Sequence, residues 1–176
     1  MFYRKLALAA VAAASMSLTA CVGATVSGAT LAAKGSQREG LFPAASAGDP
    51  VAQTDLGKSW CCMGPGFDTQ RATEWFCEAA HQDFAEAQYE LGRIYDGDVS
   101  RTMAPGQKLI RMATAQRDTP LSLMWLELAA AQGHEDAADR AEMVRGDMSA
   151  EELTESAALA ATWRDAPCEF DDVFAS

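Results

Sequence analysis

The sequence predicts an all-α protein built as a short α-solenoid of helical hairpins and closed by a C-terminal capping helix. Its 176 residues are 49% hydrophobic and include only six prolines, a composition typical of helical domains. Two helical phrases also recur. WFCEAAHQDFAEA, which begins at Trp75, returns as WLELAAAQGHEDA at Trp125, and AQTDLGKSW at Ala52 returns 35 residues later as AQYELGRIY at Ala87. Recurrence at such a period indicates stacked helical hairpins.

The first residues predict a targeting segment that is not part of the fold. Arg4 and Lys5 form a charged start, and the apolar run from Leu6 to Leu18 is too short to span a bilayer comfortably. We therefore expect residues 1–20 to be a lipoprotein signal peptide.

The end of this segment, Leu18-Thr19-Ala20-Cys21, resembles the bacterial lipobox, in which a peptidase cuts before a cysteine that carries acyl chains such as palmitate. The resemblance implies that Cys21 is the lipidated first residue of the mature chain, because two or three acyl chains anchor a protein stably. An ordinary secretory signal cut near Ala20 is the alternative. Val22 then resembles the Gram-negative signal for the outer membrane. We expect a lipid-anchored protein of the cell envelope, in the outer membrane and facing the periplasm.

The mature chain divides into three expected parts. Residues 21–47 follow the signal peptide and are rich in Gly, Ala, Ser and Thr without a helical apolar period, so we expect a flexible tether. Residues 48–164 carry the repeats and form the folded domain. Residues 165–176 form an acidic tail that we expect to be irregular.

The first expected hairpin begins with a helix at Ala52 to Trp60. Ala52, Leu56 and Trp60 recur at i, i+4 and i+8 and form one apolar face. A Gly- and Pro-rich turn at 63–68 leads to a helix from about Thr69 to Gln82. The apolar side of this second helix carries Ala72, Trp75, Phe76, Ala79 and Ala80.

The second unit repeats the first helix from about Ala85, with Leu91 in the place of Leu56. Gly57 and Gly92 occupy equivalent positions beside the apolar face, where a missing side chain lets a neighbouring helix approach closely. We expect the polar residues between these positions to lie on the surface: Gln53, Lys58, Gln88 and Arg93. A longer connection at 98–120, with an extra helix at 107–117, explains why the Trp phrase recurs after 50 residues.

The third unit follows Trp125 and has an eroded first helix at Glu135 to Val144. Ser149 to Glu152 then form a capping box, which predicts a helix through about Arg164. The apolar face expected for this helix consists of Leu153, Ala157, Ala160 and Trp163. With one apolar face, the helix can close the end of the stack.

These phrases resemble Sel-one-like repeats, a class of tetratricopeptide-like helical hairpins, from about Gly48 to Arg145. The positions that match are Ala52, Leu56, Gly57, Ala79, Ala80, Ala87, Leu91, Gly92, Ala129, Ala130, Gln132, Gly133 and Ala137. The departures are Cys62 where glycine is usual, His81-Gln82-Asp83, and the long middle insertion. The resemblance implies a concave surface and an adaptor that holds proteins or peptides, and some exported members are linked to envelope processes.

Composition and motifs narrow the functions further. The net charge of −11 includes no basic stripe, so we expect no nucleic-acid partner. We find no serine-nucleophile motif and no phosphate-binding loop, and the capping box accounts for the pair Glu151 and Glu152. We therefore expect no catalytic residues, no cofactor and no metal. The hypothesis is a lipid-anchored scaffold that binds a protein or peptide partner in the envelope.

Four cysteines besides Cys21 offer a second kind of site. Cys61, Cys62, Cys77 and Cys168 are candidates for two disulfides, and three pairings are open. We expect neither bond to join the neighbours Cys61 and Cys62. The alternative hypothesis is an enzyme or a binder of cell-wall or β-lactam-like ligands that uses Cys77 and His81, one helical turn apart.

Overall fold

The computed structural model describes residues 31–62, 67–98 and 117–165. The chain divides into two compact units, residues 1–37 and residues 38–176. Of the first unit the described residues, 31–37, are helical. The second unit contains the repeats. Cys21, Cys168, the expected helix at 107–116 and most of the turn and tail lie outside the described residues, so the predictions made for them stay predictions.

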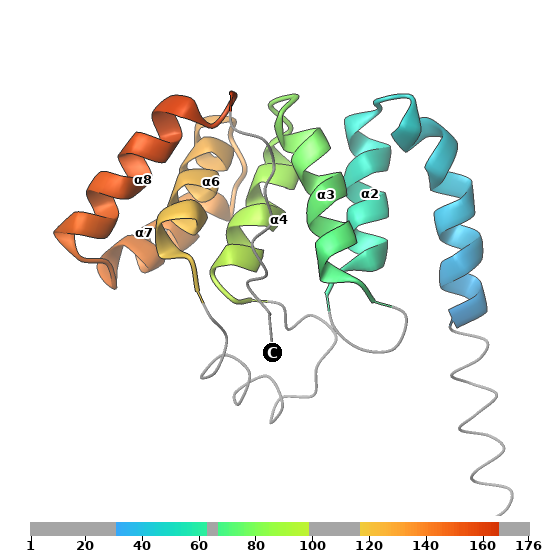
Figure 1. Cartoon of the computed structure of the whole chain (residues 1–176), viewed down its shortest axis with the longest axis horizontal. Helices are drawn as coiled ribbons and strands as arrows, with labels where there is room; N and C mark the ends of the chain where they lie inside the picture. The colour runs from blue at the N-terminus through green and yellow to red at the C-terminus, as the bar shows by residue number, and fades with distance from the viewer. Residues whose placement is uncertain (1–30, 63–66, 99–116, 166–176) are drawn as a thin grey trace, which may run out of the picture. The chain divides into compact units, whose positions relative to one another are not determined.

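The second unit begins with helical residues 38–46, called here the segment 38–46, and contains six further described helices. These are α2 (Pro50–Trp60), α3 (Thr69–Ala80), α4 (Ala85–Tyr95), α6 (Thr119–Ala131), α7 (Ala137–Gly146) and α8 (Ala150–Thr162). Helix α2 packs against α3, α3 against α4 and α4 against α6, and α6 also contacts α7 and α8 (Figure 1). Every regular element in the described ranges is a helix, so the predicted all-α solenoid is confirmed. None of these helices is both long and apolar enough to cross a bilayer.

Acidic and hydroxyl side chains determine where several helices begin. The Asp49 carboxylate accepts hydrogen bonds from the backbone N–H groups of Val51 and Ala52 at 2.9 and 3.0 Å and caps α2. At the start of α8 the predicted capping box is confirmed, because Ser149 and Glu152 exchange hydrogen bonds. The backbone N–H of Ser149, with the hydroxyl of Thr119, lowers the pKa of Glu152.

The predicted repeat register is confirmed in the core. Leu56 and Leu91 are both buried, with 1% and 0% of their surface exposed. A Cβ on Gly57 would lie 2.7 Å from Phe76 Cε1, and one on Gly92 would lie 2.6 Å from Leu126 Cγ. Both glycines therefore let the facing helix approach, as the repeated phrase predicts.

The expected flexible tether is wrong for residues 38–46, which are helical and pack on α2. Ala45 is 1% exposed and belongs to a hydrophobic cluster with Ala52 and Leu56. The Gln53 side chain donates a hydrogen bond to the Ala45 carbonyl at 3.2 Å. Gln88 makes the equivalent bond of 3.2 Å to the carbonyl at the end of α3. The segment 38–46 is thus ordered by α2 in the way that α3 is ordered by α4.

The turns that follow the segment 38–46, α3 and α6 share one backbone conformation. Gly48, Asp83 and Gly133 each have positive φ, at 92°, 60° and 86°. Gly48 follows an Ala pair and precedes Ala52 with the same spacing by which Gly133 precedes Ala137. This spacing was the sequence signal for an additional half-repeat, and the segment 38–46 is its second helix.

Three side chains that we expected on the surface are buried: Gln53 is 4% exposed, Gln88 0% and Arg93 6%. The two glutamines are buried because each binds a helix-terminal carbonyl. Arg93 is buried because carboxylates surround it, with Glu90 Oε2 at 3.0 Å and Asp98 Oδ2 at 3.1 Å. These bonds offset much of the cost of burying the polar groups, although Gln88 Oε1 has no hydrogen-bond partner.

The last two helices differ slightly from the prediction, α7 in its first residue and α8 in its buried face. Helix α7 begins at Ala137, two residues after its expected start. On α8, Trp163 is buried and Leu153 and Ala160 pack against the core, as expected. The prediction that Ala157 lies on the buried face is wrong, because Ala157 is exposed. Ser156, which is 2% exposed, takes its place on that face. An i+3 step from Leu153 replaces the i+4 step that we assumed.

Candidate functional site

The three described cysteines gather at the end of the first hairpin. The structure joins Cys61 to Cys62, so the expectation that these neighbours stay unjoined is wrong. The chain leaves α2 at Trp60, and Cys61 ends the helix with an extended backbone. Cys77 lies with Cys62 in one hydrophobic cluster. The pairing of Cys168 stays a prediction.

Cys77 and His81, the pair of the alternative hypothesis, do not form an accessible site. Cys77 is 1% exposed, so its sulfur lies inside the core where a ligand cannot approach it. His81 ends α3, and its ring packs edge-on against Trp163 at 5.5 Å between centroids. Within the described ranges no three His, Cys, Asp or Glu side chains are placed to hold a metal ion.

His134 belongs to a polar contact that links three parts of the stack. Its Nε2 lies 2.9 Å from Glu86 Oε2, and its ring stacks on Tyr89 with centroids 4.1 Å apart. Lys58 Nζ reaches the other Glu86 oxygen at 2.5 Å. Burial opposes ionisation of Glu86, but the hydrogen bonds and charges of Lys58 and His134 prevail and lower its pKa. The arrangement connects α2, α4 and the turn before α7, which is a structural role.

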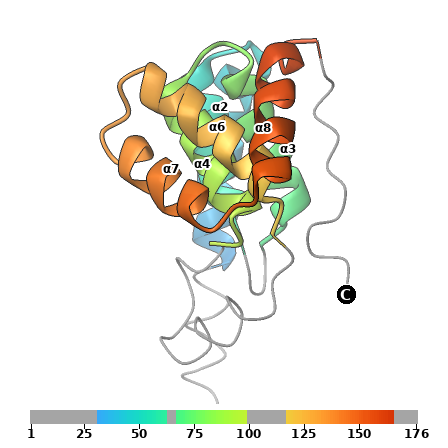
Figure 2. The ribbon, with the colours of Figure 1, turned by 90° about the vertical axis from the view of Figure 1, so that its left-hand side faces the viewer.

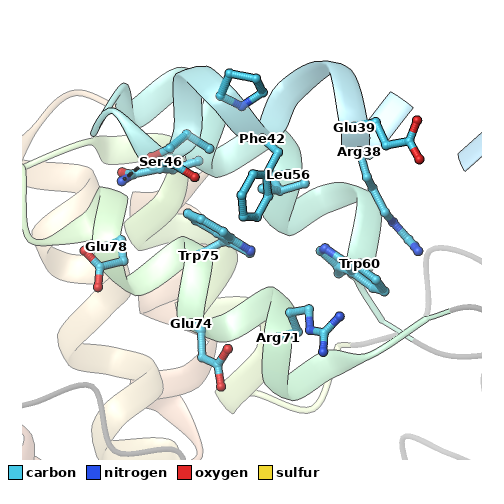
Figure 3. A pocket seen from close by; sticks show the side chains of 13 residues that line it. Arg38, Glu39, Phe42, Ser46, Leu56, Trp60, Arg71, Glu74, Trp75 and Glu78 are labelled. Atoms are coloured by element: carbon cyan, nitrogen blue, oxygen red, sulfur yellow. Dashed lines mark hydrogen bonds between the residues drawn. The ribbon is translucent and has the colours of Figure 1, made fainter. Parts of the chain in front are cut away.

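An open cleft of about 780 Å³ lies on the first hairpin, between the segment 38–46 and α3. Helix α2 forms its floor with Leu56 and Trp60 (Figure 3). Phe42 stands over the cleft and is 56% exposed, although its ring packs edge-on against Trp75 at 5.8 Å and 81°. A large apolar side chain this exposed beside a half-buried tryptophan indicates a binding surface.

Two arginines flank Trp60 at one end of the cleft. The guanidinium of Arg38 lies 3.5 Å from the ring centroid and that of Arg71 lies 4.7 Å from it. Arg38 also donates to the Ser59 carbonyl at 2.6 Å. Burial of its guanidinium and the positive charge of Arg71 lower the pKa of Arg38. Both cations are thus held in place on an aromatic face before any partner arrives.

Acidic side chains line both sides of the cleft beyond the two arginines. Glu74 and Glu78 lie one and two turns after Arg71 on α3, and Glu39 lies across from them on the segment 38–46. All three are exposed. The cleft therefore has an aromatic centre, a positive end and a negative side, which are features of recognition surfaces.

Sequence reasoning placed this site incorrectly. Phe42 fell within the expected tether, and Trp60 and Trp75, which were assigned to the core, pack against it and also line the cleft. Gln53, Gln88 and Arg93, which we expected on the surface, are buried instead. The missed signal was the Ala pair and Gly48 ahead of the first repeat, which mark a helix beside α2.

Comparison with known families agrees with this architecture. The chain matches the Sel1 repeat family three times, over residues 50–84, 85–101 and 113–134. No curated protein matches the chain. Sel1 repeats commonly mediate protein–protein interaction, and proteins that contain them are typically non-catalytic scaffolds. The helical stack described above is therefore similar to Sel1 repeats over these three stretches.

Proposed function

We propose that this protein is a non-catalytic scaffold that binds a protein or peptide partner in the bacterial cell envelope through the cleft beside the first repeat. The observation that carries the proposal is the exposed Phe42 on Trp75, in an open cleft whose rim carries both signs of charge. Aromatic side chains in a cleft with a polar rim supply most of the binding energy in protein interfaces.

The envelope location rests on the lipobox-like residues that end in Cys21. We propose that acyl chains on Cys21 anchor the mature chain in the outer membrane. An anchored scaffold meets other envelope proteins at a raised local concentration, so a cleft of modest affinity is sufficient for capture.

Photocrosslinking in the producing bacterium tests this function. A photoreactive phenylalanine analogue replaces Phe42, and the matched control carries it at Met143, which is 64% exposed on α7 away from the cleft. We expect adducts with an envelope protein from position 42 and none of the same mass from position 143. Identical adducts at both positions, or none at position 42, would contradict the proposal.

A further inference from the structure

The repeat gives the cleft an equivalent set of positions, called here the second groove. The cleft, or first groove, lies between the segment 38–46 and α3 over α2, and the second groove corresponds to positions on α3, α6 and α4. The floor residue Leu56 corresponds to Leu91 after 35 residues, and Ser46 on the rim corresponds to His81 at the same offset. Trp75 of the first groove corresponds to Trp125 of the second through the repeated Trp phrase.

The end of α8 fills the second groove. Trp163 is 7% exposed and packs edge-on against both His81 and Trp125, with ring centroids 5.5 and 5.4 Å apart. Leu159 and Ala160, from the preceding turn, pack against the same hydrophobic cluster. Helix α8 lies alongside α6 with its C-terminal end toward α3 (Figure 2). The positions equivalent to the cleft are thus closed by a helix of the chain itself.

Polar contacts at both ends set the direction of α8. At its start, the Thr119 hydroxyl of α6 donates to Glu152 Oε1 at 2.8 Å. At its end, Arg164 Nη2 pairs with Asp83 Oδ1 at 2.5 Å, after the last turn of α3. The acidic start of the helix therefore lies on α6, and the Trp–Arg pair at its end reaches the C-terminal end of α3.

The wall of the filled second groove is apolar, whereas the wall of the open cleft is charged. On α6 the wall of the filled groove carries Leu121, Met124 and Leu128, which all pack in the core. The equivalent positions on α3, 50 residues earlier, carry Arg71, Glu74 and Glu78. The tryptophan between them is kept in both walls. An aromatic centre with a charged rim is stable in water when empty and matches a partner that brings opposite charges.

We propose that an amphipathic helix of a partner protein occupies the first groove as α8 occupies the second. An aromatic side chain near its C-terminal end packs between Phe42 and Trp75, acidic residues in its first turn face Arg71, and a basic residue at its end faces Glu78. This order of charges also suits a helix dipole. The inference rests on the proposed function, because it names the class of partner for the same cleft.

A peptide with the sequence of residues 149–164 of this chain, SAEELTESAALAATWR, tests the inference because it has the required order of charges and the aromatic residue. The peptide carries fluorescein and is titrated with the purified full chain while fluorescence anisotropy is measured. We expect saturable binding that weakens about tenfold or more for Trp75→Ala, as for a central aromatic residue in an interface. A peptide with alanine at the position of Trp163 should not bind.

Two further variants keep the test decisive. Phe42→Ala removes an exposed ring, so it reports on the groove even if Trp75→Ala disturbs folding, and Arg71→Glu should weaken binding by repelling the acidic first turn. Glu142→Ala, on the exposed side of α7, is the matched control and should leave affinity unchanged. Peptide affinity that is the same in Phe42→Ala and Trp75→Ala as in the original chain would overturn the inference.

Two other outcomes separate this inference from the proposed function. If position 42 crosslinks an envelope protein while the peptide does not bind, the helical partner is wrong and the scaffold function stands. If the peptide binds while no crosslink forms in cells, the groove accepts a helix and the envelope function is contradicted. Self-association of the full chain that Trp75→Ala abolishes would make a second copy the occupant and overturn the partner assignment.

Discussion

Gly92 faces Leu126 so closely that a Cβ on the glycine would lie 2.6 Å from the leucine Cγ. Gly57 faces Phe76 in the same way, at 2.7 Å from Cε1. The glycines lie 35 residues apart and the two facing residues lie 50 apart, so one close helix contact is used in both hairpins. Such contacts determine how near the two helices of each pair can lie.

Gly92→Ala should lower the free energy of unfolding by about 1–3 kcal/mol, because the added methyl group overpacks the contact with Leu126. This loss exceeds the gain of about 1 kcal/mol that alanine brings to a helix interior. Gly146→Ala is the control, since a Cβ there would meet nothing within 4 Å. Urea unfolding should show a lower midpoint for the first variant and an equal or higher midpoint for the second. Equal shifts in both would show that the close contact does not limit packing.

Arg93→Ala should destabilise the protein by about 3–5 kcal/mol, because it leaves the buried Glu90 carboxylate without its cation. Lys58→Ala, at the equivalent position 35 residues earlier, should change stability by about 0–1 kcal/mol. Its ion pair with Glu86 is about one-third exposed and solvent weakens it. Thermal unfolding monitored by circular dichroism distinguishes the two. Equal tolerance of both substitutions would show that the burial of Arg93 contributes nothing.

Glu86→Gln should reduce stability at neutral pH, and the difference from the original chain should shrink in acid. The pKa of Glu86 is lowered from 4.5, so its ionised form favours the folded state. That contribution is complete above pH 4.5 and is lost as pH falls through the lower folded pKa. Urea midpoints measured at several pH values test this sign. Glu142→Gln, on an exposed face of α7, should show no such pH-dependent difference.

Cys21→Ala should release the protein from the membrane into the soluble periplasmic fraction, because the substitution removes the residue that would carry the acyl chains. Fractionation and detergent partitioning of cells that produce either form measure the change. Replacement of Cys61, which leaves the lipobox-like residues intact, is the control and should leave the protein in the membrane fraction. A Cys21→Ala protein that still partitions with the membrane would refute the anchor.

Local patterns predicted much of the fold. The spacing of Leu56 and Leu91 identified the buried face of each hairpin, and Ser149 with Glu152 marked the start of α8. These features depend on neighbours within a turn or two of helix, so a sequence records them directly.

The cleft depends on contacts that a local pattern does not contain. The segment 38–46 has Gly40 and Pro43 and a weak apolar period, and its helix is held by the bond from Gln53 to Ala45. The exposure of Phe42 follows from which helix covers which groove. Arg93 was misplaced for a similar reason, since its burial depends on a carboxylate beyond the end of its own helix.

The coverage of one groove by α8 has a consequence for stoichiometry. Within the described helices, the end of α8 covers the second groove, and the cleft beside Trp75 is open. Through this surface a single copy is monovalent, so it cannot bridge two identical partners. Any larger assembly that it organises would need several copies side by side, and its size would follow the number of copies rather than the number of repeats in each chain.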